Sequence, residues 1–233
     1  MGLKKFRIIS NLIICAMLIV FVTYLGTNSY QYAFSYQNSE VIYNGNRDSN
    51  KISIMINVYW GTEYIDDILD ILDAYEAKCT FFVGGQWVEK EPEKLQKIYS
   101  RGHEIGSHGY FHLDHNHLDY NQNYEEIHVN HALVKSILDI DMQLFAPPSG
   151  SFNKSTIEAS KNLGYKVIMW SKDTIDWRDK DANLIFNRAT KNIKGGDFIL
   201  AHPTEQTLKA LPMIFEYYKL NNYAATTVSE NLK

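Results

Sequence analysis

Two histidines four residues apart, His108 and His112, are the first side chains in this sequence whose type and spacing could hold a metal ion. A helical turn or a tight loop points side chains four residues apart in the same direction, so both imidazoles could bind one cation. Histidine pairs in loops are often solvated instead, so the pair alone is weak evidence. The sequence has two cysteines, Cys15 and Cys79, and any further ligand is therefore expected to be a histidine or a carboxylate.

A second pair, Asp176 and His202, could move a proton. Asp176 precedes Trp177, and His202 ends the apolar run 197–202. A carboxylate that holds one nitrogen of an imidazole sets its tautomer and its pKa, which is the usual arrangement for a general acid. Alternatively, Asp176 caps the following turn and His202 is an ordinary core histidine. The spacing favours neither interpretation.

These side chains follow short β-prone runs that alternate with amphipathic helical stretches from Lys51 onward. The alternation predicts parallel strands with crossover helices, and about 180 residues suit either an open doubly wound sheet or an incomplete barrel. Polar residues at the carboxyl ends of parallel strands meet on one face, where chemistry is expected. The expected strands are 52–58, 79–83, 104–108, 144–147, 166–170, 197–202 and 223–228, and the expected helices are 64–76, 87–100, 124–139, 154–163, 182–193 and 207–220.

The N-terminus has the pattern of an export or anchoring segment. Three cations within the first seven residues precede the uncharged run 8–26. Nineteen residues at about 1.5 Å each approach the roughly 30 Å core of a bilayer, and the cations favour a cytoplasmic N-terminus. We expect a signal anchor over 1–26, or a signal peptide if it is cleaved, then a polar linker over 27–50 and a folded domain over 51–233. The protein is accordingly expected in the cell membrane with an extracellular domain, or secreted.

Composition limits the partners. Hydrophobic residues make up 45% of the chain, which is typical of one globular domain with a full core. Lys and Arg total 23 against 27 Asp and Glu, so the formal net charge is -4, and the chain has no polybasic stretch. A nucleic acid is therefore not an expected partner.

Five segments, taken together and in this order, resemble the motifs of the polysaccharide deacetylase family, also called carbohydrate esterase family 4 or the NodB homology domain. They are Thr80 to Val83, Gly102 to His108 with His112, Phe145 to Gly150, Asp176 with Trp177, and His202 after Phe198, Ile199 and Leu200. The resemblance covers about residues 51–231. It implies an α/β fold, a deformed (β/α) barrel of about seven strands, that removes acetyl groups from sugar polymers with a divalent metal, usually Zn²⁺.

The resemblance also implies roles for the two pairs. The family's H-x-x-x-H motif supplies two metal ligands and maps onto His108 and His112. The last two motifs supply an Asp paired with a His that protonates the leaving amine, and they map onto Asp176 and His202.

The first and third motifs depart from the family pattern. The family's T-F-D-D-G is Asn57 to Gly61 here, so Tyr59 stands at the general base and Trp60 at the metal-binding carboxylate. In the family's R-x-P-Y-G, Ala146 replaces the arginine and Ser149 the tyrosine. A subgroup of polymer deacetylases from endospore-forming bacteria is similar here, with N-V-x-W-G and A-P-P-S-G.

Two acids could replace the missing ones. Glu63 follows Gly61 on the same loop, and Asp173 precedes the Asp176 motif. Glu63 also suits the N-terminus of the helix expected from Tyr64, where the helix dipole favours a negative charge.

Two functions remain open. The first is an exported metal-dependent deacetylase that acts on N-acetylhexosamine residues of a cell-wall polysaccharide, peptidoglycan-like or chitin-like. In this deacetylase, His108 and His112 would bind the metal, and His202 would act as the general acid. The attacking water would be deprotonated by Glu63, by Asp173 or through polarisation by the metal alone.

The alternative is a catalytically silent glycan-binding protein on the same fold, motivated by the missing acids. Its stacking faces for sugar rings would be Tyr59, Trp60, Trp170 and Trp177, with Ser149 as a further substrate-binding residue. For Trp170 the alternative, ordinary core packing, is favoured.

Overall fold

The computed structural model describes residues 16–20, 23 and 41–233. The chain divides into two compact units, Met1–Glu40 and Val41–Lys233. In the first unit, the described residues 16–20 and 23 are helical, and Met17 to Val20 are exposed. No helix within the described residues is long and apolar enough to cross a membrane. The expected anchor over 1–26 lies mostly outside the described residues.

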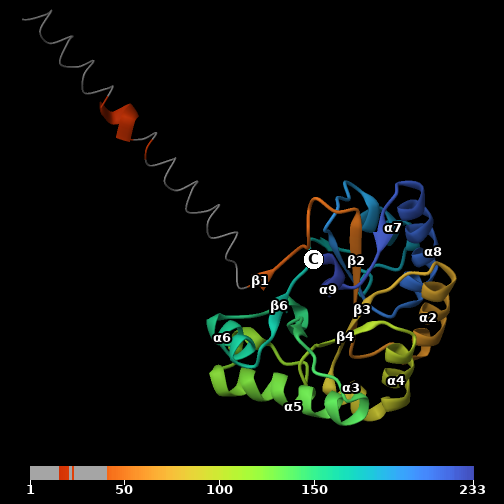
Figure 1. The fold of residues 1–233 in the computed structure, drawn as a ribbon, viewed down its shortest axis with the longest axis horizontal. Coiled ribbons are helices and arrows are strands. Elements are labelled where there is room, and N and C mark those ends of the chain that lie inside the picture. Colours follow the sequence, from red (N-terminus) through yellow and green to blue (C-terminus); the bar gives the residue numbers. More distant parts are fainter. Residues whose placement is uncertain (1–15, 21–22, 24–40) are drawn as a thin grey trace, which may run out of the picture. The chain divides into compact units, whose positions relative to one another are not determined.

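Within Val41–Lys233, nine strands form one parallel sheet (Figure 1). Its order is β1-β6-β5-β4-β3-β2-β8-β7, and β9 pairs with β2. The pairs between named strands are all parallel, which confirms the predicted α/β class. The strands are β1 (Val41–Ile42), β2 (Lys51–Val58), β3 (Thr80–Val83), β4 (Glu104–Ser107), β5 (Leu144–Phe145), β6 (Lys166–Ile168), β7 (Lys172–Asp173), β8 (Phe198–Ala201) and β9 (Ala224–Ala225).

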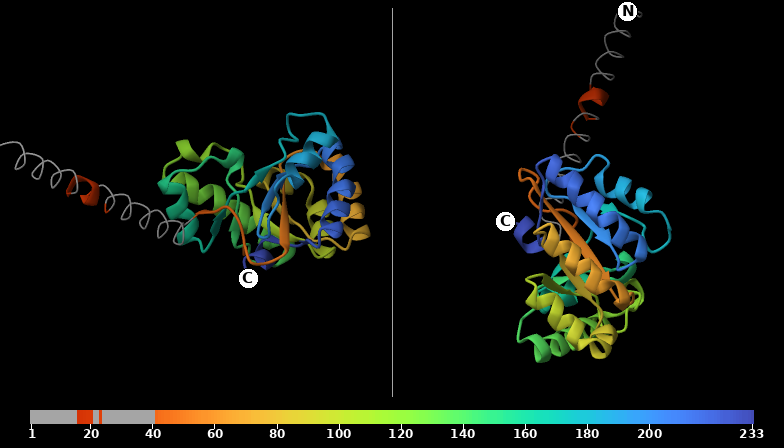
Figure 2. Two further views of the ribbon diagram at one scale, coloured as in Figure 1. Left: turned by 90° about the horizontal axis from the view of Figure 1, so that it is seen from above. Right: turned by 90° about the vertical axis from the view of Figure 1, so that its right-hand side faces the viewer.

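Helices α2 to α8 cover the outer face of the curled sheet (Figures 1 and 2), whereas α9 packs against the inner face through Val228. One group contains α2, α7 and α8, and another contains α3, α4, α5 and α6. Three short 3₁₀ turns lie at Thr62–Tyr64, His115–His117 and Pro148–Gly150. The helices are α2 (Ile65–Ala74), α3 (Gly85–Lys90), α4 (Pro92–Ser100), α5 (Tyr120–Leu138), α6 (Lys154–Asn162), α7 (Ala182–Thr190), α8 (Glu205–Leu220) and α9 (Val228–Asn231).

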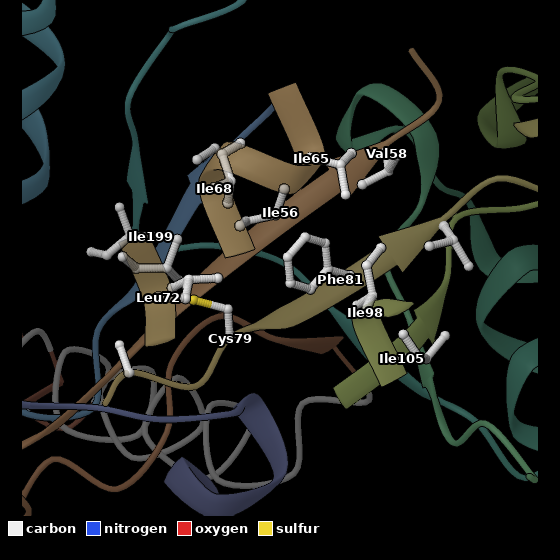
Figure 3. Packing of buried hydrophobic residues seen from close by; sticks show 14 of the residues in the cluster. Ile56, Val58, Ile65, Ile68, Leu72, Cys79, Phe81, Ile98, Ile105 and Ile199 are labelled. Atoms are coloured by element: carbon white, nitrogen blue, oxygen red, sulfur yellow. The ribbon is translucent and has the colours of Figure 1, made fainter. Parts of the chain in front are cut away.

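Strand β2 separates two apolar layers, because successive side chains of a strand point to opposite faces. Ile54, Ile56 and Val58 point outward and belong to the larger core between sheet and helices. Figure 3 shows Ile56 and Val58 near Ile65 and Ile68 of α2. On the inner face, Met55 packs in a smaller cluster with six other buried residues, Phe82, Leu144, Ala146, Ile168, Phe198 and Val228. The barrel interior is therefore filled below the carboxyl ends of the strands.

Two expected elements were wrong in their bounds. The expected helix 87–100 is two helices, α3 and α4, because Pro92 has no N–H to donate and disfavours helical geometry at the residue before it. The expected strand 223–228 is the two-residue β9 followed by helix α9. The short strands β1 and β7 were not expected.

The expected linker over 27–50 also ends too late, since residues 41–50, which we call the N-terminal strap, belong to the folded unit. Val41 and Ile42 pair with β6 of the sheet, and Asn44 forms a bridge with Asp197 before β8. Arg47 Nη1 donates to Asp197 Oδ1 at 2.6 Å and to the Gly195 carbonyl at 3.1 Å. The strap thereby links β6 to the amino-terminal end of β8. Residues 27–40 lie outside the described residues.

Candidate functional site

A pocket of about 350 Å³ opens where the strands end at their carboxyl termini. Residues that follow β2, β4, β5, β6 and β8 contribute to it. His108, His112 and His202 line it, as the parallel topology requires, and the buried Asp176 contacts His202 from outside the pocket. Its lining residues are Asn57, Tyr59, Trp60, His108, His112, Ser149, Trp170, Asp173, Trp177, Leu200 and His202.

The two histidines of the H-x-x-x-H motif lie side by side in this pocket. Their ring centroids are 5.1 Å apart. His108, directly after β4, is 2% exposed, and its Nδ1 donates to the Ala146 carbonyl at 2.7 Å. Burial, with a smaller effect from His112, lowers the pKa of His108 to about 3, and burial also lowers the pKa of His112. Both rings are therefore neutral at pH 7, and His108 keeps an unprotonated Nε2.

The loop that carries His112 is held from behind by a buried carboxylate. Glu126 of α5 is 5% exposed, and its Oε2 accepts the backbone N–H groups of Tyr110 at 3.0 Å and Phe111 at 2.9 Å. Burial raises the pKa of Glu126. His112 adopts a left-handed backbone conformation with φ 59°. These contacts position the second imidazole.

The Asp176 and His202 pair forms as the general-acid interpretation requires. His202 Nδ1 donates to Asp176 Oδ1 at 2.8 Å. Asp176 Oδ2 accepts the His202 backbone N–H at 2.6 Å and the Thr207 hydroxyl at 2.5 Å. The Asp176 side chain is fully buried, whereas the His202 side chain is 16% exposed at the pocket. The carboxylate thus fixes the ring with its Nε2 directed away from Asp176.

Aromatic rings occupy the two positions where the family places acids. The Tyr59 ring stacks on His112 with centroids 4.6 Å apart, and its hydroxyl donates to Gln86 Oε1 at 2.6 Å. The Trp60 ring lies nearly parallel to His202, with centroids 5.9 Å apart and an angle of 4° between the planes. Aromatic side chains therefore cover the imidazoles of His112 and His202.

The side chains present do not fit a zinc site. Among the described residues, no three side chains of His, Cys, Asp or Glu lie close enough together to hold a metal ion. A catalytic zinc normally has three protein ligands and a water molecule. His108 and His112 supply two nitrogen atoms, and Trp60 stands at the place of the carboxylate. The metal expected from the resemblance stays a prediction for this chain.

The two substitute acids differ in position. Glu63 is exposed on the 3₁₀ turn Thr62–Tyr64 and does not line the pocket, so the structure does not bring it to the histidines. Gly61 has φ 80° and turns the chain away at this point. Asp173 does line the pocket, and its Oδ1 accepts the N–H of Ile175 at 2.8 Å.

The remaining expected residues lie around the pocket. Ser149, in a left-handed conformation with φ 55°, and the exposed Trp177 both line it. Arg178 lies 6.0 Å from the ring centroid of Trp177. The sequence-based prediction missed Asn57 and Leu200 as lining residues. Their positions at the carboxyl ends of β2 and β8 were the available signal.

Comparisons with known proteins show which family the chain resembles. The family model for polysaccharide deacetylase matches residues 44–168. A peptidoglycan-N-acetylglucosamine deacetylase of Bacillus cereus is 32% identical over 73% of this chain and 82% of its own length. The Bacillus subtilis protein YlxY is 36% identical over 82% of this chain but only 60% of its own length. The chain belongs to the polysaccharide deacetylase family.

Solved structures with the same fold include a protein that lacks enzymatic activity and a mutant of it that has activity. A pseudoenzyme of carbohydrate esterase family 4 from Bacillus anthracis superimposes with a TM-score of 0.81 at 30% identity, over 83% of this chain and 69% of its own. A mutant of that pseudoenzyme is described as having restored enzymatic activity. The curled, parallel α/β fold expected from the resemblance is therefore confirmed, with nine strands in place of the expected seven or so.

Proposed function

We propose that this chain is a glycan-binding protein that holds N-acetylhexosamine polymers of the cell wall, peptidoglycan above all, without removing their acetyl groups. The observation that carries the proposal is the pair of aromatic rings at the positions of the family's acids. Tyr59 and Trp60 cover His112 and His202, and no third ligand for a metal lies close to the histidines among the described residues.

The ligand class rests on the lining of the pocket and on the relatives. Trp60, Trp170 and Trp177 join Tyr59 around the cavity, and Trp60 and Trp177 are 45% and 57% exposed. Flat aromatic faces with polar edges suit ligands that are apolar on one face and polar at the rim, as pyranose rings are. The relatives from Bacillus cereus and Bacillus subtilis are named as peptidoglycan deacetylases, which supports a cell-wall glycan as the ligand.

A second candidate is an atypical deacetylase, favoured by two observations. The Asp176 and His202 pair is intact, so a proton donor for a leaving amine is present. Asp173 lies in the same pocket as a carboxylate. In this candidate Asp173 replaces the missing base, and zinc dependence is part of its test.

One experiment separates the two candidates. The full chain is mixed with N-acetylglucosamine oligomers and with peptidoglycan, with and without added zinc, and binding and acetate release are both measured. Binding without acetate release supports the glycan-binding protein. Zinc-dependent release that is lost in His112→Ala supports the deacetylase instead.

The role of the Trp60 ring is tested on binding alone. We expect Trp60→Ala to weaken binding of N-acetylglucosamine oligomers by about tenfold, because an aromatic contact is worth roughly 0.5–1.5 kcal/mol beyond its buried area. Tyr99→Ala, which removes an exposed aromatic ring of α4 outside the pocket, is the matched control. Equal affinity in both variants would contradict the proposed pocket.

We also propose that the folded unit lies on the outer side of the cell membrane. The support is the run 8–26 with its flanking cations. Protease added to intact cells should then digest the folded unit, whereas protection until the cells are lysed would refute this location.

A further inference from the structure

The side chain of Asn57 is a buried amide on the floor of the pocket. It lies on the inner face of β2, the face that Met55 shares, one residue before the strand ends. Asn57 is 4% exposed, and its side chain lines the pocket. Its Oδ1 is buried and has no hydrogen-bond partner among the described residues. A buried amide oxygen without a partner costs free energy that most folded proteins avoid.

Two other buried asparagines provide a comparison. Asn130 and Asn231 also leave Oδ1 unpaired, but each uses its Nδ2 to hold the fold together. Asn130 Nδ2 donates to the Val83 carbonyl at 2.8 Å and to Ser107 Oγ at 2.9 Å. Asn231 Nδ2 donates to Ser53 Oγ at 3.0 Å. Their role in the structure explains their burial.

Asn57 differs because its side chain makes no hydrogen bond to any described residue, so neither end of the amide supports the fold. It is also the member of this set that lines the pocket. An unpaired polar group that serves no structural contact and borders a cavity is suited to a partner that arrives from outside the protein.

We infer that Asn57 is the group that selects the acetamido substituent of the bound sugar. This inference rests on the proposed function and names the part of the glycan that the pocket floor contacts. An amide side chain carries both an acceptor and two donors, and rotation about its last torsion turns either end toward the pocket. The acetamido group also carries one donor and one acceptor, so either of its polar atoms finds a partner on Asn57.

The other polar groups of the pocket leave this role open. Asp176 holds Nδ1 of His202, and the Ala146 carbonyl holds Nδ1 of His108. Asp173 accepts a backbone N–H from Ile175. Neither Oδ1 nor Nδ2 of Asn57 makes a hydrogen bond to a described residue. The walls around it are aromatic, so they supply stacking and little discrimination between one sugar substituent and another.

The test compares two ligands in one variant of the full chain. Affinities for a tetramer of N-acetylglucosamine and for a tetramer of β-1,4-linked glucose are measured by calorimetry, for the wild type and for Asn57→Leu, which keeps the branched shape and the number of heavy atoms of the side chain. We expect the wild type to prefer the acetylated ligand and Asn57→Leu to lose about tenfold in affinity for it, with little change for the glucose tetramer.

Thermal unfolding of the same variants shows whether Asn57 is structural. Asn57→Leu should unfold at the same or a higher temperature, because it replaces an unpaired buried amide with an apolar side chain. The matched control is Asn130→Leu, which loses two structural hydrogen bonds and should unfold at a lower temperature without changing the ratio of the two affinities.

Each outcome has a distinct meaning. An unchanged affinity ratio in Asn57→Leu, with glycan binding intact in the wild type, overturns the role of Asn57 alone. A lower unfolding temperature with an unchanged ratio assigns Asn57 to the fold and also overturns it. A wild type that binds no glycan overturns the proposed function, and the inference falls with it.

Discussion

The fully buried carboxylate of Asp176 offers the most informative perturbation of the site. It accepts three hydrogen bonds, from Nδ1 of His202, the backbone N–H of His202 and the hydroxyl of Thr207. Hydrogen bonds to a charged group contribute about 1.5–3 kcal/mol each, partly offset by the cost of burying the charge. Asp176→Ala leaves all three donors unpaired, and we expect the free energy of unfolding to fall by about 3–5 kcal/mol.

Asp176→Asn should behave differently, because an amide can keep all three contacts. Its oxygen can take the place of Oδ2, and its NH₂ then faces Nδ1 of His202. A neutral imidazole can accept that hydrogen bond if its proton moves to Nε2. We expect a loss of only about 1–2 kcal/mol, since the bonds remain but lose their charge assistance.

Urea unfolding at pH 7 measures both free energies, and ¹⁵N NMR of the histidine rings identifies the tautomer. The structure predicts Nδ1–H in the wild type and Nε2–H in Asp176→Asn. The reasoning would be refuted by Asp176→Ala within about 1 kcal/mol of the wild type. It would also be refuted if Asp176→Asn lost as much free energy of unfolding as Asp176→Ala and its His202 were still protonated on Nδ1.

Three further changes test other parts of the structure. Trp60→Asp combined with Tyr59→Asp restores the family's acids beside the two histidines, so it should bind zinc by calorimetry where Tyr59→Asp alone does not; no zinc binding would show that the histidines are misplaced. Glu126→Gln keeps an oxygen for both backbone N–H groups and removes a buried charge. Because burial raises the pKa of Glu126, the folded wild type gains stability as pH falls through that pKa, so the Gln variant should be more stable at pH 7 and lose its advantage towards pH 4; equal stability at both pH values in urea titrations would contradict this. Gly195→Ala places a Cβ 1.7 Å from the Ser49 carbonyl oxygen and should lower the free energy of unfolding by about 2–3 kcal/mol, and an unchanged unfolding midpoint would contradict the close contact of the N-terminal strap.

The main features of the site could be predicted from the sequence because of a simple topological rule. His108 and His202 lie just after the carboxyl ends of separate parallel strands, and such ends must meet on one face of the sheet. Longer amphipathic helices were also predictable, since their periodicity extends over several turns. Pro92 was a signal for the break between α3 and α4 that the periodicity concealed.

Other features depend on contacts that no local pattern encodes. Strand β1 has two residues and exists because β6 offers a free edge to it. Glu63 is adjacent to the pocket in sequence, yet the left-handed turn at Gly61, close to the Pro203 carbonyl, directs the chain elsewhere. The unpaired oxygen of Asn57 is visible only when all its neighbours are placed.

The N-terminal strap determines where a pulling force on the chain enters the folded unit. It pairs with β6 at Val167 and Ile168 and reaches the amino-terminal end of β8 at Asp197, whereas the pocket lies at the carboxyl ends of the strands. A tension applied at Val41 would load the β1 and β6 pairing and then the Arg47 and Asp197 ion pair. Because Arg47 holds the strap to the start of β8, part of a force along the chain is resisted at the end of that strand away from the pocket.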